Sequence, residues 1–316
     1  MALLTISGAP ASRWEEVAHG AAQLLGFELI TESRLAQRMA QEFGDAAIPA
    51  RAWGPAAVSV LAPLAQENHL VIAVDGAEEL FHASPALLRA RIEAPHAHRV
   101  GNLMLDRRLE KPEASACLQD LERAQKRLRK ARFGRTSSAP SACDLTASLA
   151  HLDVTQAADI LAAGAAKRLE HQGTLPSVVV DELLFEARLQ LARRAIVPQP
   201  AAADREAARA PFGHPSEKMF ANLLDFYRIE WEYEPRSFSL QWNKNGEVTE
   251  AFTPDFYLPQ FDLYVELTTM KQSLVTKKNR KVKMLRTIYP HVNIQVFYQK
   301  DFQDLVSKYG WKLAAS

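Results

Sequence analysis

Apolar residues follow two patterns in the first half of the chain, continuous runs and helical spacing. Short continuous apolar runs at 2–7 and 69–76 are typical of buried strands. Apolar residues also recur at helical spacing, which predicts helices at 15–26, 55–67, 113–134 and 155–170. Helices that separate short apolar strands predict a parallel sheet with flanking helices, so we expect an α/β fold.

The pattern changes after a stretch rich in Pro and Ala, 197–215, which is typical of a linker. An apolar stretch at 174–197 is expected to hold one strand or helix followed by a helix. We therefore expect the chain to divide into 1–172, a helical connection with the linker over 173–212, and a second domain over 213–316.

The C-terminal domain is also expected to be α/β. The pattern predicts a helix, three strands, a helix and a strand, followed by a short terminal helix. The expected ranges are 216–228, 238–242, 247–252, 262–267, 273–288 and 293–298. The strands at 238–242 and 247–252 flank an Asn-Lys-Asn-Gly turn and are expected to form a hairpin.

Composition is that of a soluble globular protein, with 47% hydrophobic and 24% charged residues and a net charge of +1. No apolar run reaches the roughly 20 residues that a membrane helix needs. The start of the chain lacks the basic region of a signal peptide, and Cys117 and Cys143 have no metal-ligand or disulfide spacing. We expect a cytoplasmic protein with no membrane partner.

The loop after the first strand has the position of a phosphate-binding loop. Such a loop and the following helix N-terminus supply backbone amides, and a lysine neutralises the transferred phosphoryl group. Here the sequence is SGAPASRW, in which Gly8 is present. Arg13 replaces the second glycine of the Walker pattern, and Trp14 replaces its lysine.

Over residues 2–168 the chain resembles the cytidylate kinase-like family of nucleoside monophosphate kinases. The motifs are LLTISGAP, LLGFELIT, HLVIAVDGAEELF, IEAPHAHRV, LERAQKRLRKARFG and CDLTASLAHLDVTQAADIL. The resemblance implies a P-loop kinase fold whose lid arginines, by position Arg123, Arg127 and Arg132, clamp phosphates. Gly8 and Arg13 are the candidate nucleotide-binding residues of the loop, where Arg13 could partly replace the missing lysine. Because the lysine and the magnesium-binding Ser/Thr are missing, we expect a degenerate kinase. Three interpretations stay open: a remnant without ligand, a nucleotide sensor, and an active kinase.

Two carboxylates in the C-terminal domain have the spacing of a metal site. Glu266 is expected on the polar face of an alternating strand, and Asp255 follows Pro254 at a bend before it. A hairpin of this length brings the two carboxylates together, where they can bind Mg²⁺ or Mn²⁺. The alternative is a turn aspartate and a solvated glutamate.

On this frame, residues 213–300 resemble the PD-(D/E)xK nuclease superfamily, a group with a restriction-endonuclease-like fold. The motif corresponds to Pro254, Asp255 and Glu266, and the superfamily's helix-one glutamate to Glu217. Thr268 stands where the lysine is expected. In this superfamily the lysine can act from a neighbouring position. The candidates are Lys271, which we favour, Lys278 and Lys281.

A basic helix follows the carboxylate strand. The stretch 271–286 carries no acidic residue, which is typical of a track for a nucleic acid backbone. The candidate contacts are Lys277, Lys278, Arg280, Lys281 and Lys283. The main hypothesis is a metal-dependent endonuclease or exonuclease acting on DNA or RNA, fused to a degenerate kinase-like domain; many such nucleases pair as homodimers. The alternatives are a non-catalytic nucleic-acid-binding regulator and an active nucleoside monophosphate kinase.

Overall fold

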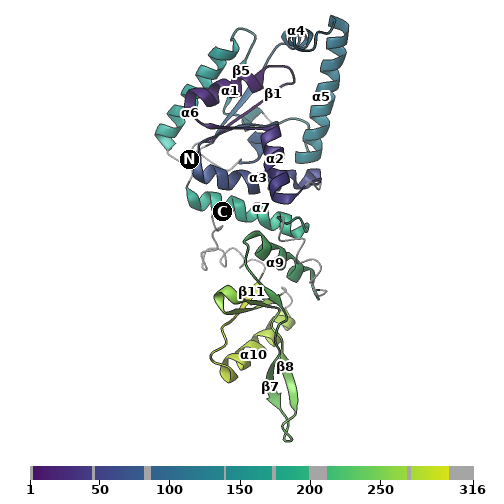
Figure 1. The fold of residues 1–316 in the computed structure, drawn as a ribbon, viewed down its shortest axis with the longest axis vertical. Coiled ribbons are helices and arrows are strands. Elements are labelled where there is room, and N and C mark those ends of the chain that lie inside the picture. Colours follow the sequence, from purple (N-terminus) through teal and green to yellow (C-terminus); the bar gives the residue numbers. More distant parts are fainter. Residues whose placement is uncertain are drawn as a thin grey trace. The chain divides into compact units, whose positions relative to one another are not determined.

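The computed structural model describes residues 3–44, 47–81, 87–138, 140–172, 176–198, 212–268 and 272–298. The chain divides into two compact units, Met1–Gln190 and Leu191–Ser316. The boundary between them falls inside one helix, α7 (Ser177–Arg193). Figure 1 labels the helices and strands of each unit.

The first unit is built on a five-stranded parallel sheet in the order β2-β3-β1-β4-β5. Its strands are β1 (Leu3–Gly8), β2 (Glu28–Thr31), β3 (Leu70–Ala73), β4 (Leu87–Glu93) and β5 (Leu145–Ser148). β1 lies in the middle and is buried along its whole length, as expected of a continuous apolar strand covered on both faces. The predicted parallel sheet with flanking helices is confirmed.

Helices cover both faces of this sheet (Figure 1). They are α1 (Trp14–Leu25), α2 (Glu32–Phe43), α3 (Ala50–Glu67), α4 (His96–Arg107), α5 (Lys111–Phe133) and α6 (Val154–Gln172). α1 and α6 pack together on one face through Val17, Ala21 and Leu161. α1 ends where Gly26 takes a left-handed conformation with φ 66°, which a residue without a side chain adopts at no steric cost.

The segment that links the predicted domains is simpler than expected where it is described. Instead of a strand or helix followed by a helix, residues Ser177–Arg193 form the single helix α7. The Pro- and Ala-rich stretch at 199–211 and the expected terminal helix after 298 lie outside the described residues.

The second unit contains a mixed four-stranded sheet in the order β11-β10-β9-β6 and the two-stranded sheet β7-β8. Its elements are α9 (Pro215–Phe226), β6 (Glu232–Tyr233), β7 (Phe238–Trp242), β8 (Val248–Phe252), β9 (Phe256–Leu258), β10 (Leu263–Thr268), α10 (Gln272–Ile288) and β11 (Ile294–Tyr298). The predicted order of helix, three strands, helix and strand is therefore incomplete. Two short strands, β6 and β9, were missed because each is too short to show an alternating pattern.

β10 is a central strand, paired with β9 on one side and β11 on the other. Its Glu266 is only 2% exposed and Thr268 only 6%. Glu266 was predicted on a polar face opposite the core, but both faces of β10 are covered at this end, which also rules out the alternative of a solvated glutamate. A buried carboxylate needs a compensating charge or ligand, so Glu266 is expected to have a cationic neighbour.

No helix among the described residues has the length and apolar character needed to cross a bilayer.

Candidate functional site

The two predicted carboxylates converge. β9 and β10 pair antiparallel with Phe256 opposite Val265. In this register the next two opposing positions are Asp255 and Glu266. The backbone amide of Leu267 donates to Asp255 Oδ2 at 2.6 Å, which fixes the aspartate beside β10. Asp255 is 7% exposed. The turn residue and the strand residue thus form one buried acidic pair.

Among the side chains that the structure describes, the amine nearest to this pair belongs to Lys278 on α10. Its Nζ lies 2.5 Å from Glu266 Oε1 and 3.7 Å from Asp255 Oδ2. It also donates to the main-chain carbonyl of Leu267 at 2.7 Å. One ammonium group is therefore surrounded by oxygens from both carboxylates and from the backbone of β10. Lys271, which the sequence favoured, lies outside the described residues.

Burial dominates the protonation of the acidic pair. It raises the pKa of Asp255 to about 6, and the charge of Lys278 lowers that value only in part. Burial and the neighbouring Asp255 raise the pKa of Glu266 to about 7. Burial also acts to lower the pKa of Lys278, but the charges of Glu266 and Asp255 outweigh it and leave the pKa raised. The pair repels a second negative charge and favours a cation.

The donor set fits a hard divalent cation in part. Glu266 Oε2 and Thr268 Oγ1 are buried and have no hydrogen-bond partner among the described residues, so the site holds unused oxygen ligands. Magnesium is commonly held by one or two carboxylates and keeps several waters. Within the residues that the structure describes, however, no group of three His, Cys, Asp or Glu side chains gathers for a metal. Asp255 and Glu266 would hold the ion.

Glu217, the predicted helper, is engaged at the start of α9. Its Oε2 accepts from the backbone amides of Gly213 at 2.9 Å and His214 at 3.2 Å, and from Tyr233 Oη at 2.8 Å. This is a capping box, which satisfies the free amides at the helix start. Its charge still contributes to the raised pKa of Asp255. Glu217 thus lies near the pair but holds the helix end.

The predicted nucleic-acid contacts on α10 separate into different environments. Lys278 belongs to the acidic pair, as above. Arg280 pairs with both oxygens of Glu250 at 2.7 and 3.0 Å, and Lys281 donates to the carbonyl of Ala251 at 3.0 Å. Lys283 is exposed. The side chain of Lys277 lies outside the described residues.

A groove of about 890 Å³ runs between the second half of α10 and the strand β11. Lys283, Arg286 and His291 contribute its basic side chains. A concave surface with this charge suits a phosphate backbone.

The loop between β1 and α1 has the predicted position between a strand and a helix, but its own side chains fill it. A Cβ atom added at Gly8 would lie 2.6 Å from Cβ of Trp14, so the residue that replaces the lysine packs directly against the glycine. Trp14 is 7% exposed and belongs to the core between the sheet and α1. Two loop amides donate to the backbone, Ala9 to the carbonyl of Ile92 and Ser12 to that of Ala9.

The predicted phosphate-clamping arginines contact protein groups. Arg13 pairs with Glu16 at 2.8 Å and Asp106 at 3.1 Å. Arg132 pairs with Glu32 at 2.7 Å and its guanidinium lies 3.8 Å from the ring centre of Trp53. Arg123 pairs with Asp120 on its own helix, and Arg127 is exposed.

The most buried arginine of α5 was not among the predicted site residues. Arg129 is 3% exposed and lies 2.6 Å from both Asp75 Oδ1 and Glu78 Oε1. Ser138 joins the same network by donating to Glu78 at 2.7 Å. The sequence could have indicated that Arg129 is buried, because it lies on the same helix face as Leu118 and Gln125, at spacings of seven and four residues. α5 is therefore fixed to the end of β3 by buried charges.

Beside the loop between β1 and α1 lies a second groove, of about 640 Å³. Ser12 and Arg13 line one end, and the rest is mostly apolar, with Ala97, Met104 and Leu152 among the lining residues. The Oγ of Ser12 is buried with no hydrogen-bond partner among the described residues.

Solved structures of small-molecule kinases match the N-terminal half of the chain. An uncharacterized protein from Eubacterium ventriosum ATCC 27560 matches with a TM-score of 0.45 at 15% identity, over 52% of this chain and 98% of its own. A gluconokinase from Sinorhizobium meliloti 1021 matches with a TM-score of 0.37 at 15% identity, over 54% and 95%. The shikimate kinase from Acinetobacter baumannii, solved with shikimate, matches with a TM-score of 0.32 at 15% identity, over 54% and 96%. No protein-family profile and no curated protein matches the sequence.

Proposed function

We propose that the second unit is a divalent-metal-dependent nuclease that hydrolyses phosphodiester bonds of nucleic acid. The observation that carries this proposal is the convergence of Asp255, Glu266 and the Lys278 ammonium at one buried point. The raised pKa values of both carboxylates and the unpartnered Glu266 Oε2 support a cation-binding role. The basic groove between α10 and β11 supports a polyanionic substrate.

In this proposal Asp255 and Glu266 would hold Mg²⁺ or Mn²⁺, and the bound cation would supply polarisation of the phosphodiester and a water of lowered pKa. Lys278 neutralises charge that develops on the phosphate oxygens, from a position fixed by the Leu267 carbonyl. The water oxygen bonds to phosphorus and one phosphorus–oxygen ester bond breaks. The products are a phosphate monoester and a free hydroxyl end.

The test is cleavage of labelled duplex and single-stranded DNA and RNA by the full-length protein with Mg²⁺ or Mn²⁺. We expect cleavage that stops on chelation and is lost in Asp255→Asn and in Glu266→Gln. The matched control is Asp262→Asn, which changes a carboxylate in the turn before β10 that contacts Tyr257. A wild-type protein that cleaves none of these substrates, or an Asp255→Asn variant that cleaves as wild type, contradicts the proposal.

A second candidate function is a non-catalytic nucleic-acid-binding protein. It is favoured by the incomplete ligand set, since only two carboxylates meet at the site within the described residues. In that case isothermal titration calorimetry detects no binding of Mg²⁺ or Mn²⁺, while the wild type binds nucleic acid.

For the first unit we propose a kinase-like domain that transfers no phosphoryl group. Trp14 occupies the lysine position as a core residue, and Arg13 is neutralised by two carboxylates. A nucleotide ligand stays a prediction, and the apolar groove beside Arg13 is where its base would bind. Incubation with labelled ATP and CMP tests the proposal, and transfer of label to CMP contradicts it.

A further inference from the structure

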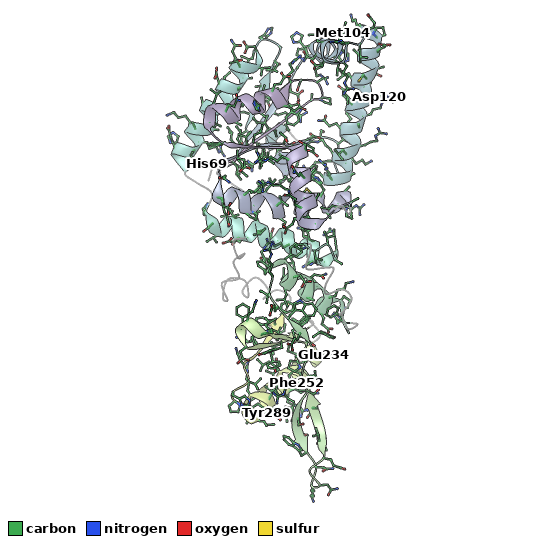
Figure 2. The ribbon with its side chains drawn as sticks, in the orientation of Figure 1. His69, Met104, Asp120, Glu234, Phe252 and Tyr289 are labelled. Carbon is green, nitrogen blue, oxygen red and sulfur yellow. The ribbon has the colours of Figure 1, made fainter. Side chains whose placement is uncertain are left out.

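The hairpin β7-β8 is held firmly at its base. Phe238, Leu240 and Phe252 are buried against Val282 and Leu285 of α10 (Figure 2 labels Phe252 and Tyr289 of this cluster). Polar bonds add to this packing. Arg280 pairs with Glu250, Lys281 donates to the carbonyl of Ala251, and Tyr289 donates to the carbonyl of Ser239. The hairpin therefore moves with α10.

The outer half of the hairpin has a different character. Figure 1 shows β7 and β8 extending away from the helix and strands of their own unit. Residues 241–249 are all exposed. The turn at the tip is nevertheless ordered, because Asn243 Oδ1 accepts from the amides of Asn245 and Glu247, both at 2.9 Å. Gly246, with φ 84°, supplies the left-handed conformation that the turn needs.

An apolar pair lies just behind this turn. Trp242 and Val248 are cross-strand partners. Trp242 is 48% exposed and Val248 is 50% exposed. Single exposed apolar residues are ordinary, but a tryptophan aligned with a valine on an ordered, protruding ribbon is typical of an interaction surface.

We propose that the β7-β8 hairpin is a nucleic-acid-binding arm in which Trp242 stacks on a base or enters a groove. This inference rests on the proposed nuclease function and names a further contact with the same substrate. The charge of α10 (Gln272–Ile288), the helix on which the hairpin packs, favours nucleic acid as the bound partner, because every charged residue of this helix is basic. Glu250, the acidic residue of the hairpin base, is neutralised by Arg280. A two-stranded ribbon fits the major groove, and an indole ring stacks on any base.

The arm and the candidate site are positioned by the same two elements. β8 ends at Phe252, three residues before Asp255, and α10 carries Lys278 as well as the arm-binding Arg280 and Lys281. Val248 precedes Asp255 by seven residues, so their separation is at most about 25 Å for an extended chain. That is less than one turn of duplex, whose pitch is about 34 Å. One bound nucleic acid can therefore reach both.

The experiment measures binding without cleavage. Full-length protein carrying Asp255→Asn is titrated into fluorescent 30-residue DNA and RNA probes, each in single- and double-stranded form, and the dissociation constant is read from anisotropy. Adding Trp242→Ala is expected to weaken binding of at least one probe by about tenfold. Trp242→Phe should restore most of the affinity, and Gln241→Ala, the exposed neighbour on the same strand, should leave it unchanged.

Equal dissociation constants for Trp242→Ala and its parent on all probes overturn the proposal, provided that circular dichroism shows both folded. It is also overturned if sedimentation shows that Trp242→Ala separates a dimer while nucleic acid binding is unchanged, since the partner is then a second copy of this chain. A wild type that binds nucleic acid through Trp242 but does not cleave it would contradict the nuclease proposal and still support the proposed role of the hairpin in binding.

Discussion

At the residue scale, the ammonium of Lys278 does two things for the acidic pair. It compensates negative charge that would otherwise be buried, and its hydrogen bond to the Leu267 carbonyl holds it beside Glu266 Oε1. Breaking a buried ion pair by removing one partner is costly, because the remaining charge has no compensation. A bound divalent cation can supply that compensation in place of the lysine.

Replacement of Lys278 should therefore separate cation binding from catalysis. In Lys278→Ala we expect cleavage to fall by about 100-fold, as for loss of one electrostatic stabiliser, while Mg²⁺ affinity stays equal or becomes tighter. Lys218, exposed on α9, provides the control, and Lys218→Ala should cleave as wild type. If Lys271→Ala abolishes cleavage and Lys278→Ala does not, the assignment of the amine is wrong.

Cation binding should depend on pH. The pKa of Asp255 is raised to about 6 and that of Glu266 to about 7, so both carry protons in the metal-free site at pH 5 and neither does at pH 8. A cation must displace these protons, so affinity should rise through this interval and level off above it. Calorimetry with Mn²⁺ in buffers of different ionisation enthalpy measures the protons released. Affinity that is the same at pH 5.5 and pH 8 contradicts the prediction.

The sequence was sufficient to bring the two carboxylates together, and it left three lysines as candidates for the amine, a choice that stays a prediction. Asp255 and Glu266 meet because an antiparallel register follows from the turn between β9 and β10. Lys271 is closest along the chain, but the choice depends on helical register. Lys278 lies four residues before Val282 and seven before Leu285, on the buried face of α10. The position of Lys278 on the apolar face of the predicted helix was the feature of the sequence that could have indicated its place beside the carboxylates.

At the scale of elements, α5 is a structural helix in this protein. Its capping box of Glu110 and Glu113 fixes the start, and the buried pairs of Arg129 fix the other half to Asp75 and Glu78. A lid that closes over phosphates needs arginines that can leave their resting partners. Arg129 cannot leave its partners without removing the compensating charge from the carboxylates of Asp75 and Glu78.

Arg129→Ala should accordingly destabilise the first unit by about 3–5 kcal/mol, because Asp75 and Glu78 lose their buried partner. Arg123 lies on the same helix and is exposed with an exposed partner, so Arg123→Ala should change the free energy of unfolding by less than about 0.5 kcal/mol. Urea unfolding followed by circular dichroism compares the two. Equal unfolding curves would show that the network contributes nothing.

Element prediction succeeded where a repeating pattern was long enough to be detected. The apolar runs of β1 and β3 and the amphipathic helices α1, α5 and α10 were predicted within a few residues. β6 and β9 were missed because strands of two and three residues form only through pairing with β10 and its neighbours. The buried environment of Glu266 was missed for the same reason, since β10 becomes central only when β9 pairs with it.

For the whole molecule, the net charge of +1 gives no driving force toward a polyanion. Affinity for nucleic acid has to come from the uneven placement of charge, and α10 concentrates basic residues on one element. Each phosphate contact displaces condensed counterions, which makes the salt dependence a count of contacts.

Lys283→Ala should reduce the slope of log affinity against log salt concentration by about 0.9, the value for one lost phosphate contact on duplex DNA. Lys283 is exposed and lines the basic groove. Lys167→Ala, on α6 of the first unit, removes an exposed lysine paired with Glu170 and leaves the net charge of the protein equal to that of Lys283→Ala. An identical slope in both variants would show that total charge, and not α10, sets the affinity.

The contact between Gly8 and Trp14 also bears on how the first unit can change. An indole that fills the core beneath β1 cannot be exchanged for a lysine without opening a void and burying an amine there. Arg13, Ser12 and the loop amides would have to rearrange in the same step. A lysine could therefore not be introduced at position 14 by one substitution alone, and any series of substitutions toward a phosphate-binding lysine there must pass through less stable variants.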